Sequence, residues 1–466
     1  MKILMVAYDN DSYITWFPQG LAYLASAARN AGHEVEIYQQ DIFHWPDSHL
    51  TEYLDKNHFD VVEVSVIGGY YQYHKLLSIS AAINASKNRS NLKYTIGGHG
   101  PAAAPEYFLR KTKADVVGIG EGEITFVELL DAFAGKRSLE SVDGIAYFDP
   151  EGGRYIRTKA RELIQDIDEI AWPAYDLFDM TYYTLLRLPN IKGNERAIPV
   201  LSGRGCIFQC NFCYRLDKGF RPRSAKSIIE EVEFLKKEYN VKYIAFSDEL
   251  LMSSRERTLE LCQAFIDAEL NVKWDCNGRL NFADIDVLSK MKEAGCVFIN
   301  YGIESLDNET LKVMHKGLTR DMIIRGVENT LKVGISPGLN IIYGNINEPL
   351  SAIDDAVEFL LKYDDHSQMR TIRPVTPYPG SELFEYAIEH HLIEDVADFY
   401  ENKHVNSDLL SVNFTQYTDD EVYSALYNAN MRLIKRYQEI QAEKAERTCA
   451  DLYLNRNASF RGFRQT

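Results

Sequence analysis

The first ~140 residues alternate short apolar runs with amphipathic stretches. The segments KILMVAY, FDVVEVSVI, KYTIGG and ADVVGIG are apolar enough to predict buried strands. Between them, FPQGLAYLASAARNAG and QYHKLLSISAAINASK space their apolar positions as amphipathic helices do. Strands that alternate with helices are typical of a parallel sheet, so we predict an α/β domain over residues 1–142.

The hydrophobic pattern becomes irregular over residues 143–195. The segment GIAYFDPEGGRYIRT predicts a short pair of strands, and EIAWPAYDLFDM follows it without clear periodicity. We therefore expect a linker here, with the domain boundary inside it.

A second α/β series begins at residue 196. Helical stretches such as AKSIIEEVEFLKKEY and RERTLELCQAFIDAE separate six predicted strands, at 197–203, 241–248, 272–279, 296–305, 336–345 and 369–377. This pattern predicts a partial (β/α)6 barrel over residues 196–392, followed by a small, mostly helical C-terminal region over residues 393–466.

Polar residues lie at the ends of these predicted strands. The functional groups of a βα barrel gather at the carboxyl ends of its strands. The candidates there are Ser247, Asp248, Glu249, Arg279, Glu304, Asn345 and Arg373.

Composition and charge narrow the classes of function. The 466 residues, 45% of them hydrophobic, are enough for two or three domains with cores of their own. The chain shows no basic leader and no apolar run of about 20 residues, so we expect a cytoplasmic protein without a membrane span. The net charge is −17 and no long run of Lys and Arg occurs, so we expect no nucleic-acid partner.

Glycines follow the predicted strands of the first domain. They occur in VIGGYY, IGGHG and GIGEGE. In an open α/β sheet, ligands bind beyond the carboxyl ends of the strands, where glycine lets a large ligand approach the backbone. Plain strand-to-helix turns explain the same glycines equally well at this stage.

Three of the seven cysteines, Cys206, Cys210 and Cys213, form a C-x3-C-x2-C motif directly after the first barrel strand. Zinc would require a fourth ligand at finger-like spacing, but the next histidine downstream is His315. A ferredoxin-type cluster would require a fourth cysteine. Three thiolates suit a [4Fe–4S] cluster with one open iron, which can take the amino and carboxylate groups of S-adenosylmethionine. The alternative is three structural thiols, which is how we interpret the scattered Cys262, Cys276, Cys296 and Cys449.

Several segments together resemble a known superfamily. GRGCIFQCNFC, YIAFSDELL, WDCNGRL, GCVFINYGIES and TPYPGSELFEYA resemble the radical S-adenosylmethionine (SAM) enzymes. GGHGPAAAPE and ADVVGIGEGEITFVELL resemble the cobalamin-binding domain fused upstream in the cobalamin-dependent branch. The resemblance covers the chain to about residue 440. It implies a Rossmann-like cobalamin-binding domain before a TIM-type partial barrel, with a [4Fe–4S] cluster, SAM and cobalamin as cofactors.

The resemblance also assigns residues to the cluster and SAM. Cys206, Cys210 and Cys213 would ligate the cluster. The superfamily often has a Gly-Gly-Glu segment that receives the methionyl amino group, and at this place the chain has Ser247, Asp248 and Glu249. These residues depart from the common motif. The remaining assignments are Phe212 and Tyr214 near the adenine, Arg279 at the methionyl carboxylate, Glu304 at the ribose or amino group, and Asn345 and Arg373 at the same cofactor site. Ion pairs at a barrel rim are the alternative for the charged residues.

In the upstream domain the resemblance gives the glycine-rich turns a ligand. The residues that would line the corrin and its nucleotide tail are Ser65, Gly68, Gly69, Tyr70, Gly97, Gly98, His99, Gly120 and Glu121. The D-x-H-x-x-G motif that supplies an axial histidine in other cobalamin proteins is missing. We therefore assign neither His74 nor His99 as a cobalt ligand.

The resemblance favours a methyltransferase. A methyl group would move from SAM by way of methylcobalamin to an unactivated carbon of a small-molecule or natural-product substrate. A second SAM would yield the hydrogen-abstracting radical, with the electron supplied by an external flavodoxin or ferredoxin. We expect the substrate to enter between the domains, with residues 400–466 as a lid.

Three alternatives stay open at this stage. The same architecture resembles enzymes that use these cofactors for cyclisation, oxidation or rearrangement without methyl transfer. Methylthiotransferases have a related layout but need three further N-terminal cysteines, and no cysteine precedes Cys206. A non-catalytic cobalamin or iron-sulfur protein belongs to a different class altogether.

Overall fold

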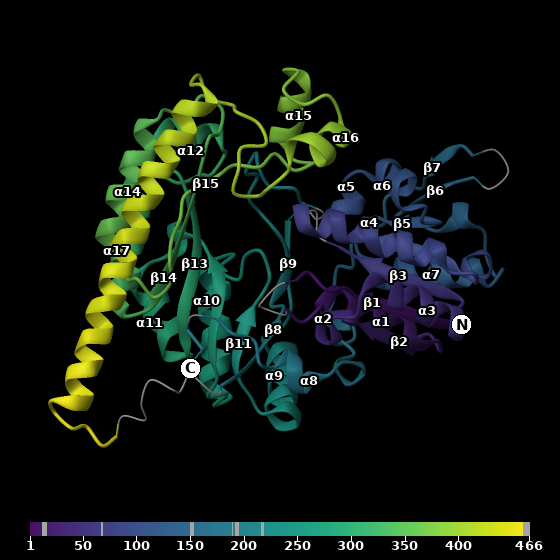
Figure 1. Ribbon diagram of the computed structural model, residues 1–466. Coiled ribbons are helices and arrows are strands. Elements are labelled where there is room, and N and C mark those ends of the chain that lie inside the picture. The colour runs from purple at the N-terminus through teal and green to yellow at the C-terminus, as the bar shows by residue number, and fades with distance from the viewer. Residues whose placement is uncertain are drawn as a thin grey trace.

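The computed structural model describes residues 1–11, 16–66, 69–149, 153–188, 190–191, 195–215 and 219–459, and of Tyr70 only the backbone. Two α/β parts lie side by side, and a long C-terminal helix runs along the outer side of the second part (Figure 1). In the described residues, the order of elements confirms the predicted fold class: a Rossmann-like domain, a partial barrel and a helical C-terminal region.

The first part is built on a seven-stranded sheet with the order β2-β1-β3-β4-β5-β6-β7. Its strands are β1 (Lys2–Ala7), β2 (Glu34–Gln39), β3 (Val61–Ser65), β4 (Lys93–Gly97), β5 (Val116–Gly118), β6 (Ile145–Phe148) and β7 (Tyr155–Arg157). The first five strands are parallel and the last two pair antiparallel. The pattern analysis did not predict β2, because this edge strand (EVEIYQ) is only half-buried and has no apolar run.

Helices cover both faces of this sheet. On one face lie α1 (Gln19–Asn30) and α7 (Gly122–Phe133). The other face carries α3 (Asp47–Lys56), α4 (Tyr70–Ala85) and α6 (Pro105–Thr112), and short helices α2 (Gln40–Phe43) and α5 (His99–Ala103) follow β2 and β4. The direction of winding changes between β1 and β3, and open α/β sheets bind ligands beyond the carboxyl ends of the strands at such a point.

Residues after 142 also belong to this sheet, because β6 and β7 extend it beyond β5. The start of the predicted linker therefore lies inside the sheet, as the two strands predicted over GIAYFDPEGGRYIRT. The rest of the connecting segment, with the short helix α8 (Met180–Tyr183), packs back between the two parts. There Tyr175 stacks on Phe17, with ring centroids 5.3 Å apart.

The second part is a six-stranded parallel sheet with the order β15-β14-β13-β12-β11-β8. Its strands are β8 (Arg196–Val200), β11 (Val241–Phe246), β12 (Lys273–Gly278), β13 (Cys296–Glu304), β14 (Ser336–Tyr343) and β15 (Arg373–Pro374). Each predicted barrel strand is present. The sixth is much shorter than predicted, because prolines in RPVTPYP cannot donate hydrogen bonds to a sheet.

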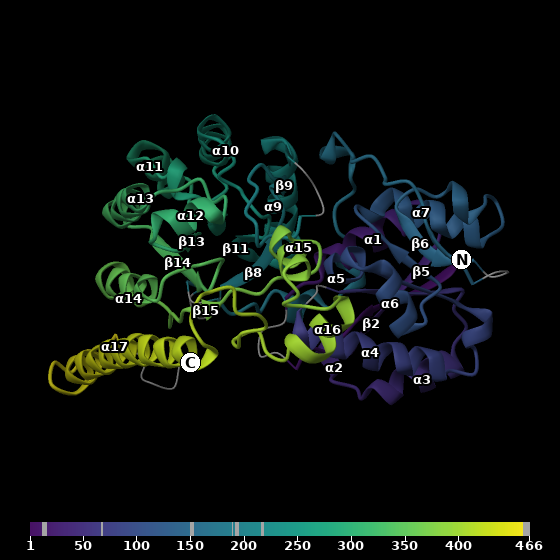
Figure 2. The ribbon, with the colours of Figure 1, turned by 90° about the horizontal axis from the view of Figure 1, so that it is seen from above.

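A row of helices covers one face of this open sheet (Figure 2). They are α9 (Ala225–Tyr239), α10 (Arg255–Asp267), α11 (Ile285–Glu293), α13 (Arg320–Val333) and α14 (Ser351–Tyr363), with the short α12 (Asn308–Val313) after β13. A separate antiparallel pair, β9 (Gly203–Cys206) and β10 (Gly219–Pro222), flanks the cysteine motif.

The C-terminal region divides into two pieces. Helices α15 (Glu382–Glu389) and α16 (Val396–Asp398) and a π-helical turn at Phe399–Lys403 pack onto the first part, where Tyr400 stacks on Tyr73 at 4.7 Å between ring centroids. Helix α17 (Asp419–Tyr453) instead lies along α14, with an ion pair of 2.5 Å between Arg432 and Glu358. The expectation that residues 400–466 form a lid is wrong for α17, because its apolar stripe is buried against α14 on the outside of the sheet.

Candidate active site between the two sheets

The three cysteines of the motif lie on one loop at the carboxyl edge of the second sheet. Cys206 ends β9, and Cys210 and Cys213 share a hydrogen bond. The backbone N–H of Asn211 donates to the carbonyl oxygen of Met314 at 3.1 Å, which fixes the middle of the loop. Among the described residues, no three His, Cys, Asp or Glu side chains already stand close enough together to hold a metal ion.

Two cations lie beside Cys210. The hydrogen bond with Cys213 and the positive charges of Lys316 and Arg279 together lower the pKa of the Cys210 thiol to about 6. The same hydrogen bond raises the pKa of Cys213, and burial raises that of Cys206. The loop therefore favours a thiolate at Cys210, and the thiolate is the form that binds metals.

Arg279 is held in place by its neighbours. The guanidinium is buried directly above the ring of Phe208, with 3.4 Å between its carbon and the ring centroid. It donates to the carbonyl oxygen of Lys316 and to the sulfur of Cys210. The residue predicted for the methionyl carboxylate thus stands next to Cys210, one of the predicted cluster ligands.

Glu304 pairs with Lys316, which the sequence analysis missed. The ammonium lies 2.9 Å from the Glu304 carboxylate and 5.9 Å from the ring centroid of Phe212, and both charged side chains are buried. Glu304 itself has φ +68, a backbone conformation that is rare for residues other than glycine. Lys316 follows α12 rather than a strand, so the strand-end rule did not point to it.

Two predicted cofactor contacts support the fold. Asn345 exchanges amide hydrogen bonds with Asn211, at 3.1 and 3.2 Å, and so braces the cysteine loop. The buried Asp248 accepts the N–H and the hydroxyl of Ser202, both at 2.8 Å, and burial raises its pKa to about 6. Direct contact of either side chain with SAM stays a prediction.

The remaining residues of the predicted SAM site differ in their surroundings. Ser247 donates to the side-chain oxygen of Gln19, at the start of α1, at 2.6 Å. Glu249 is exposed, and its charge acts on Cys206 and His99. Arg373 is 61% exposed and pairs with Asp408 at 3.0 Å, so the structure does not join it to the other candidates.

The carboxyl edge of the first sheet is formed largely by backbone. Gly98 has φ +92 and ψ −179, and a Cβ there would overlap the carbonyl oxygen of Val66. Gly120 has φ +87, but a Cβ there would meet open space. Close packing between strand ends thus explains why residue 98 is glycine, without any ligand. Gly120 instead borders open space that a ligand could fill.

Other predicted corrin contacts lie at the same edge. Ser65 and Gly97 are register partners at the ends of β3 and β4, and Gly69 precedes α4. Gly68 and the side chain of Tyr70 lie outside the described residues.

His99 joins the two candidate sites. Its ring meets the ring of Tyr214, in the cysteine loop, edge to face at 6.1 Å between centroids. Burial lowers the pKa of His99, which favours the neutral ring. Glu121, predicted at the corrin, instead binds two arginines of the second part, Arg204 and Arg221.

The donor sets fit the cofactors that the sequence predicts. Three thiols on one loop beside two buried cations suit an anionic cluster and the carboxylate of SAM. Glycine turns at the switch point of a doubly wound sheet suit a large flat ligand.

Comparison with known families agrees with this geometry. Residues 7–130 match the B12 binding domain model, and residues 200–360 match the Radical SAM superfamily model. A protein of Pyrococcus horikoshii described as an uncharacterized methyltransferase, PH0819, is 32% identical over 405 residues, which cover 84% of each chain. The chain belongs to the cobalamin-dependent radical SAM enzymes. The two domains imply a [4Fe–4S] cluster, SAM and cobalamin as cofactors.

Other relatives within this family have different activities. The anaerobic magnesium-protoporphyrin IX monomethyl ester cyclase of Rubrivivax gelatinosus is 26% identical, over 79% of this chain and 66% of its own length. The cytidylyl-2-hydroxyethylphosphonate methyltransferase of Streptomyces wedmorensis is 22% identical over 82% of this chain.

Solved structures share the fold of this radical SAM enzyme. TsrM from Kitasatospora setae, with cobalamin and a [4Fe–4S] cluster bound, aligns with a TM-score of 0.67 over 84% of this chain at 18% identity. OxsB, with aqua-cobalamin and SAM bound, aligns with a TM-score of 0.66 at 19% identity. The alignment spans 83% of this chain but only 55% of OxsB.

Proposed function

We propose that this protein transfers a methyl group from SAM, by way of cobalamin, to an unactivated carbon of a small molecule. The observation that carries the proposal is the contact between the two cofactor edges, where His99 meets Tyr214 of the cysteine loop. A corrin at the first edge and SAM at the second would therefore be neighbours across one interface. The 32% identical archaeal protein, described as a methyltransferase, supports the same reaction class.

When bound, the cluster and SAM supply a carbon-centred radical and the corrin carries the methyl group. The chain's own residues bind and orient these groups. Cys206, Cys210 and Cys213 would hold the cluster, and Arg279 would pair with the methionyl carboxylate. Glu249, exposed and close enough to act on Cys206, would receive the methionyl amino group.

In the proposed reaction, aromatic packing would shield one side of the interface from water. The rings of Tyr73, Tyr107 and Tyr400 lie in contact, and the Tyr107 hydroxyl donates to Glu401 at 2.9 Å. These contacts join α4 and α6 to the π-helical turn of the C-terminal region. A radical reaction needs such shielding, because water and oxygen consume its intermediates.

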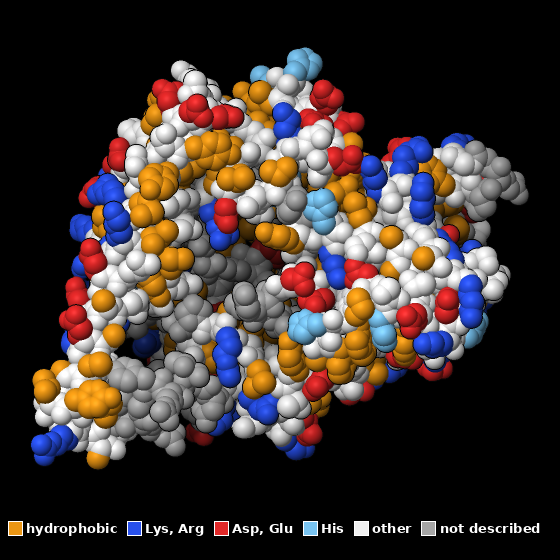
Figure 3. All heavy atoms as spheres, viewed as in Figure 1, with side chains coloured by type: hydrophobic (Ala, Val, Ile, Leu, Met, Phe, Trp, Pro, Cys, Tyr) orange, Lys and Arg blue, Asp and Glu red, His pale blue; other side chains and the backbone are white. Residues whose placement is uncertain are grey.

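The proposed partners are a small-molecule substrate and an external one-electron donor such as flavodoxin or ferredoxin, within the cytoplasm. On the face that Figure 3 shows, the described Lys and Arg side chains are interspersed with Asp and Glu and do not gather into a basic surface. Over the described residues, every helix is too short or too polar to cross a lipid bilayer.

The proposal is tested with anaerobically reconstituted protein and SAM that carries a deuterated methyl group. Small molecules extracted from the source cells serve as the substrate pool, and mass spectrometry searches for products heavier by one labelled methyl. We expect a labelled product together with S-adenosylhomocysteine and 5′-deoxyadenosine. Products that gain carbon without the label would contradict methyl transfer from SAM.

A second candidate function is cyclisation or oxidation without methyl transfer. The 26% identity to cyclases over most of this chain favours it as the alternative. In the same experiment it predicts 5′-deoxyadenosine without S-adenosylhomocysteine, and a product that has lost hydrogen instead of gaining a methyl group.

A further inference from the structure

The strand that leads into the cysteine motif is attached to the cobalamin-binding domain by buried ion pairs. Arg204 on β9 lies directly opposite Arg221 on β10 in the antiparallel register. Both arginines bind the carboxylate of Glu121, the residue before α7, each at 2.9 Å. Arg204 also binds Glu123 in the first turn of α7, at 2.5 Å.

These side chains form a closed network. The exposed fractions are 6% for Glu121, 15% for Arg204 and 10% for Arg221. Glu121 also accepts the backbone N–H of Ile164 at 2.9 Å, so both of its oxygens are used. Burial alone would raise the pKa of Glu121, but these hydrogen bonds lower it below its usual value. Removing one partner would leave a buried charge uncompensated.

The network connects two short segments that belong to different cofactor sites. Glu121 directly follows Gly120, whose positive φ and open surroundings mark the turn after β5 as a border of the corrin site. Arg204 stands two residues before Cys206, the first predicted cluster ligand. A displacement of either segment must therefore strain the same ion pairs.

We propose that Glu121, Arg204 and Arg221 are positioning residues that couple corrin binding to the geometry of the cluster loop. The inference rests on the proposed pair of cofactor sites, but it does not depend on methyl transfer. Coupling between two sites is reciprocal, so a cluster that fixes the β9–β10 pair also tightens corrin binding. Arg204 and Arg221 touch neither cofactor in this assignment, and they act through the segments that do.

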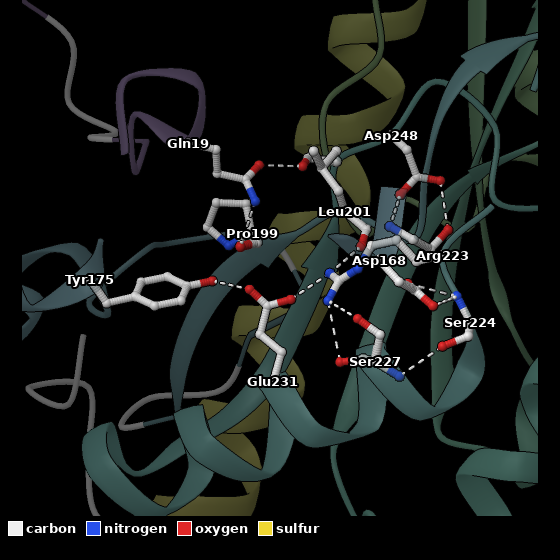
Figure 4. Close-up of polar contacts among 12 residues, drawn as sticks. Gln19, Asp168, Tyr175, Pro199, Leu201, Arg223, Ser224, Ser227, Glu231 and Asp248 are labelled. Carbon is white, nitrogen blue, oxygen red and sulfur yellow. Dashed lines mark hydrogen bonds and ion pairs between the residues drawn. The ribbon is translucent and has the colours of Figure 1, made fainter. Parts of the chain in front are cut away.

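The β9–β10 pair has a second attachment within its own domain. Arg223, just after β10, binds Glu231 of α9 at 2.5 Å and the carbonyl oxygen of Leu201 at 2.9 Å (Figure 4). The hydroxyl of Tyr175 donates to the same glutamate at 2.7 Å. Loss of the Glu121 contacts should therefore leave the strands folded and release only their link to the cobalamin domain.

The test compares Glu121→Gln with Glu128→Gln in the full chain. Glu128 lies on α7, which begins directly after Glu121, and binds Arg161 and Arg137, neither of which belongs to β9 or β10. The measured quantity is the Kd for aquacobalamin, with and without the reconstituted cluster. We expect the cluster to tighten corrin binding at least about fivefold in the wild type and in Glu128→Gln, and less than about twofold in Glu121→Gln. Equal coupling in all three proteins would overturn the inference.

A spectroscopic measurement separates positioning from simple loss of stability. Pulsed electron paramagnetic resonance gives the distance between the Co(II) corrin and the reduced cluster. We expect one narrow distance distribution in the wild type and a broad one in Glu121→Gln. If Glu121→Gln fails to fold, Arg204→Lys is measured in its place; it keeps the positive charge beside Glu121 and should give a narrow distribution. A broad distribution in Glu128→Gln as well would contradict a specific link.

The outcomes distinguish this inference from the proposed function. A wild-type chain that retains no corrin contradicts the proposed function itself. A chain that binds both cofactors without mutual coupling contradicts only the inference. Coupling without any methylated product supports the inference and contradicts methyl transfer.

Discussion

The carboxyl edges of the two parallel sheets present different chemistry. In the partial barrel, buried charged side chains lie beside the cysteine loop: Lys316 pairs with Glu304, and Arg279 donates to the backbone carbonyl oxygen of Lys316. In the cobalamin-binding domain, the same edge consists mainly of turns such as those at Gly98 and Gly120. One edge presents charged side chains to a ligand, whereas the other presents backbone and open space.

This difference determines how each edge responds to substitution. Removal of one charged side chain from a buried network leaves the charge of its partner uncompensated, so single substitutions have large local effects on stability. A backbone surface tolerates changes of side chain, except where an added Cβ meets another strand. The following predictions test this contrast.

The largest effect is expected for Cys210→Ala. The cluster loses a ligand, so iron should fall far below about four atoms per chain and SAM cleavage should fall more than about 1,000-fold. Iron analysis and 5′-deoxyadenosine formation measure this. Corrin should still bind, with the affinity of cluster-free wild-type protein. Cys449→Ala, on the exposed side of α17, is the control and should retain iron and activity. Full iron content in Cys210→Ala would refute the assigned ligand set.

Gly98→Ala tests the edge formed by backbone. Its φ of +92 and ψ of −179 lie in a region that is nearly restricted to glycine, and a Cβ would overlap Val66. We expect a loss of about 4 kcal/mol in the free energy of unfolding, measured with urea. Gly120→Ala also has a positive φ, +87, but a Cβ there meets no other atom, so it should lose only about 1 kcal/mol. Equal losses would show that the close approach at Gly98 has no energetic weight.

Lys316→Met breaks the buried pair with Glu304. The uncompensated carboxylate should cost about 3 kcal/mol of stability. Loss of the cation should also raise the pKa of Cys210, and a rise of about one unit would slow alkylation of cluster-free protein about tenfold near pH 5, below the pKa of this thiol. Peptide mass spectrometry after brief iodoacetamide treatment measures the rate at this cysteine. Lys226→Met, an exposed lysine on α9, should change neither quantity, and an unchanged rate in Lys316→Met would argue against electrostatic support of the thiolate.

The difference between the two edges also explains which residues could be predicted from the sequence. The barrel strands, the cysteine loop and Arg279 were predictable, because apolar periodicity and motif spacing report on buried strands and on side-chain ligands. Lys316 and Asn211 were missed, since neither stands at a strand end and their contacts cross more than ten residues of sequence. For this reason the spacing rules predicted candidate ligands, but not the residues that brace the cysteine loop.

The cobalamin edge was less predictable from sequence. Glycine pattern alone did not separate Gly98, which is required by strand packing, from Gly120, which borders open space. Glu121 was assigned to the corrin because it lies in a glycine-rich turn, and its arginine partners are 83 and 100 residues away in sequence. A search for charge patterns would find this link, by matching the two glutamates of GIGEGE with the arginines on either side of the cysteines.

The smallest effect is expected for Glu63→Gln, in the interior of the first sheet. Burial raises the pKa of Glu63 to about 8, and the Thr95 hydroxyl donates to it. Between its unfolded value of 4.5 and about 8, folding takes up a proton, so the wild type loses stability as the pH rises, by up to about 1.4 kcal/mol per unit. Glutamine does not titrate. The glutamine side chain would leave an N–H unpaired, which costs about 1 kcal/mol. We therefore expect Glu63→Gln to raise the free energy of unfolding by about 2 kcal/mol at pH 7 and to give no gain near pH 4.5.

Glu348 provides the matching variant in the partial barrel. Burial raises its pKa to about 7, but its carboxylate accepts the backbone N–H groups of Gly344 and Asn345 and the hydroxyl of Ser305. Glutamine has one oxygen and cannot accept all three, so Glu348→Gln should destabilise at pH 5, where the raised pKa costs the wild type less than about 1 kcal/mol. Urea unfolding from pH 5 to 8 measures both. A Glu348→Gln variant that is stabilised at pH 5 would show that the second edge does not depend on its side-chain hydrogen bonds, and the contrast between the two edges would then fail.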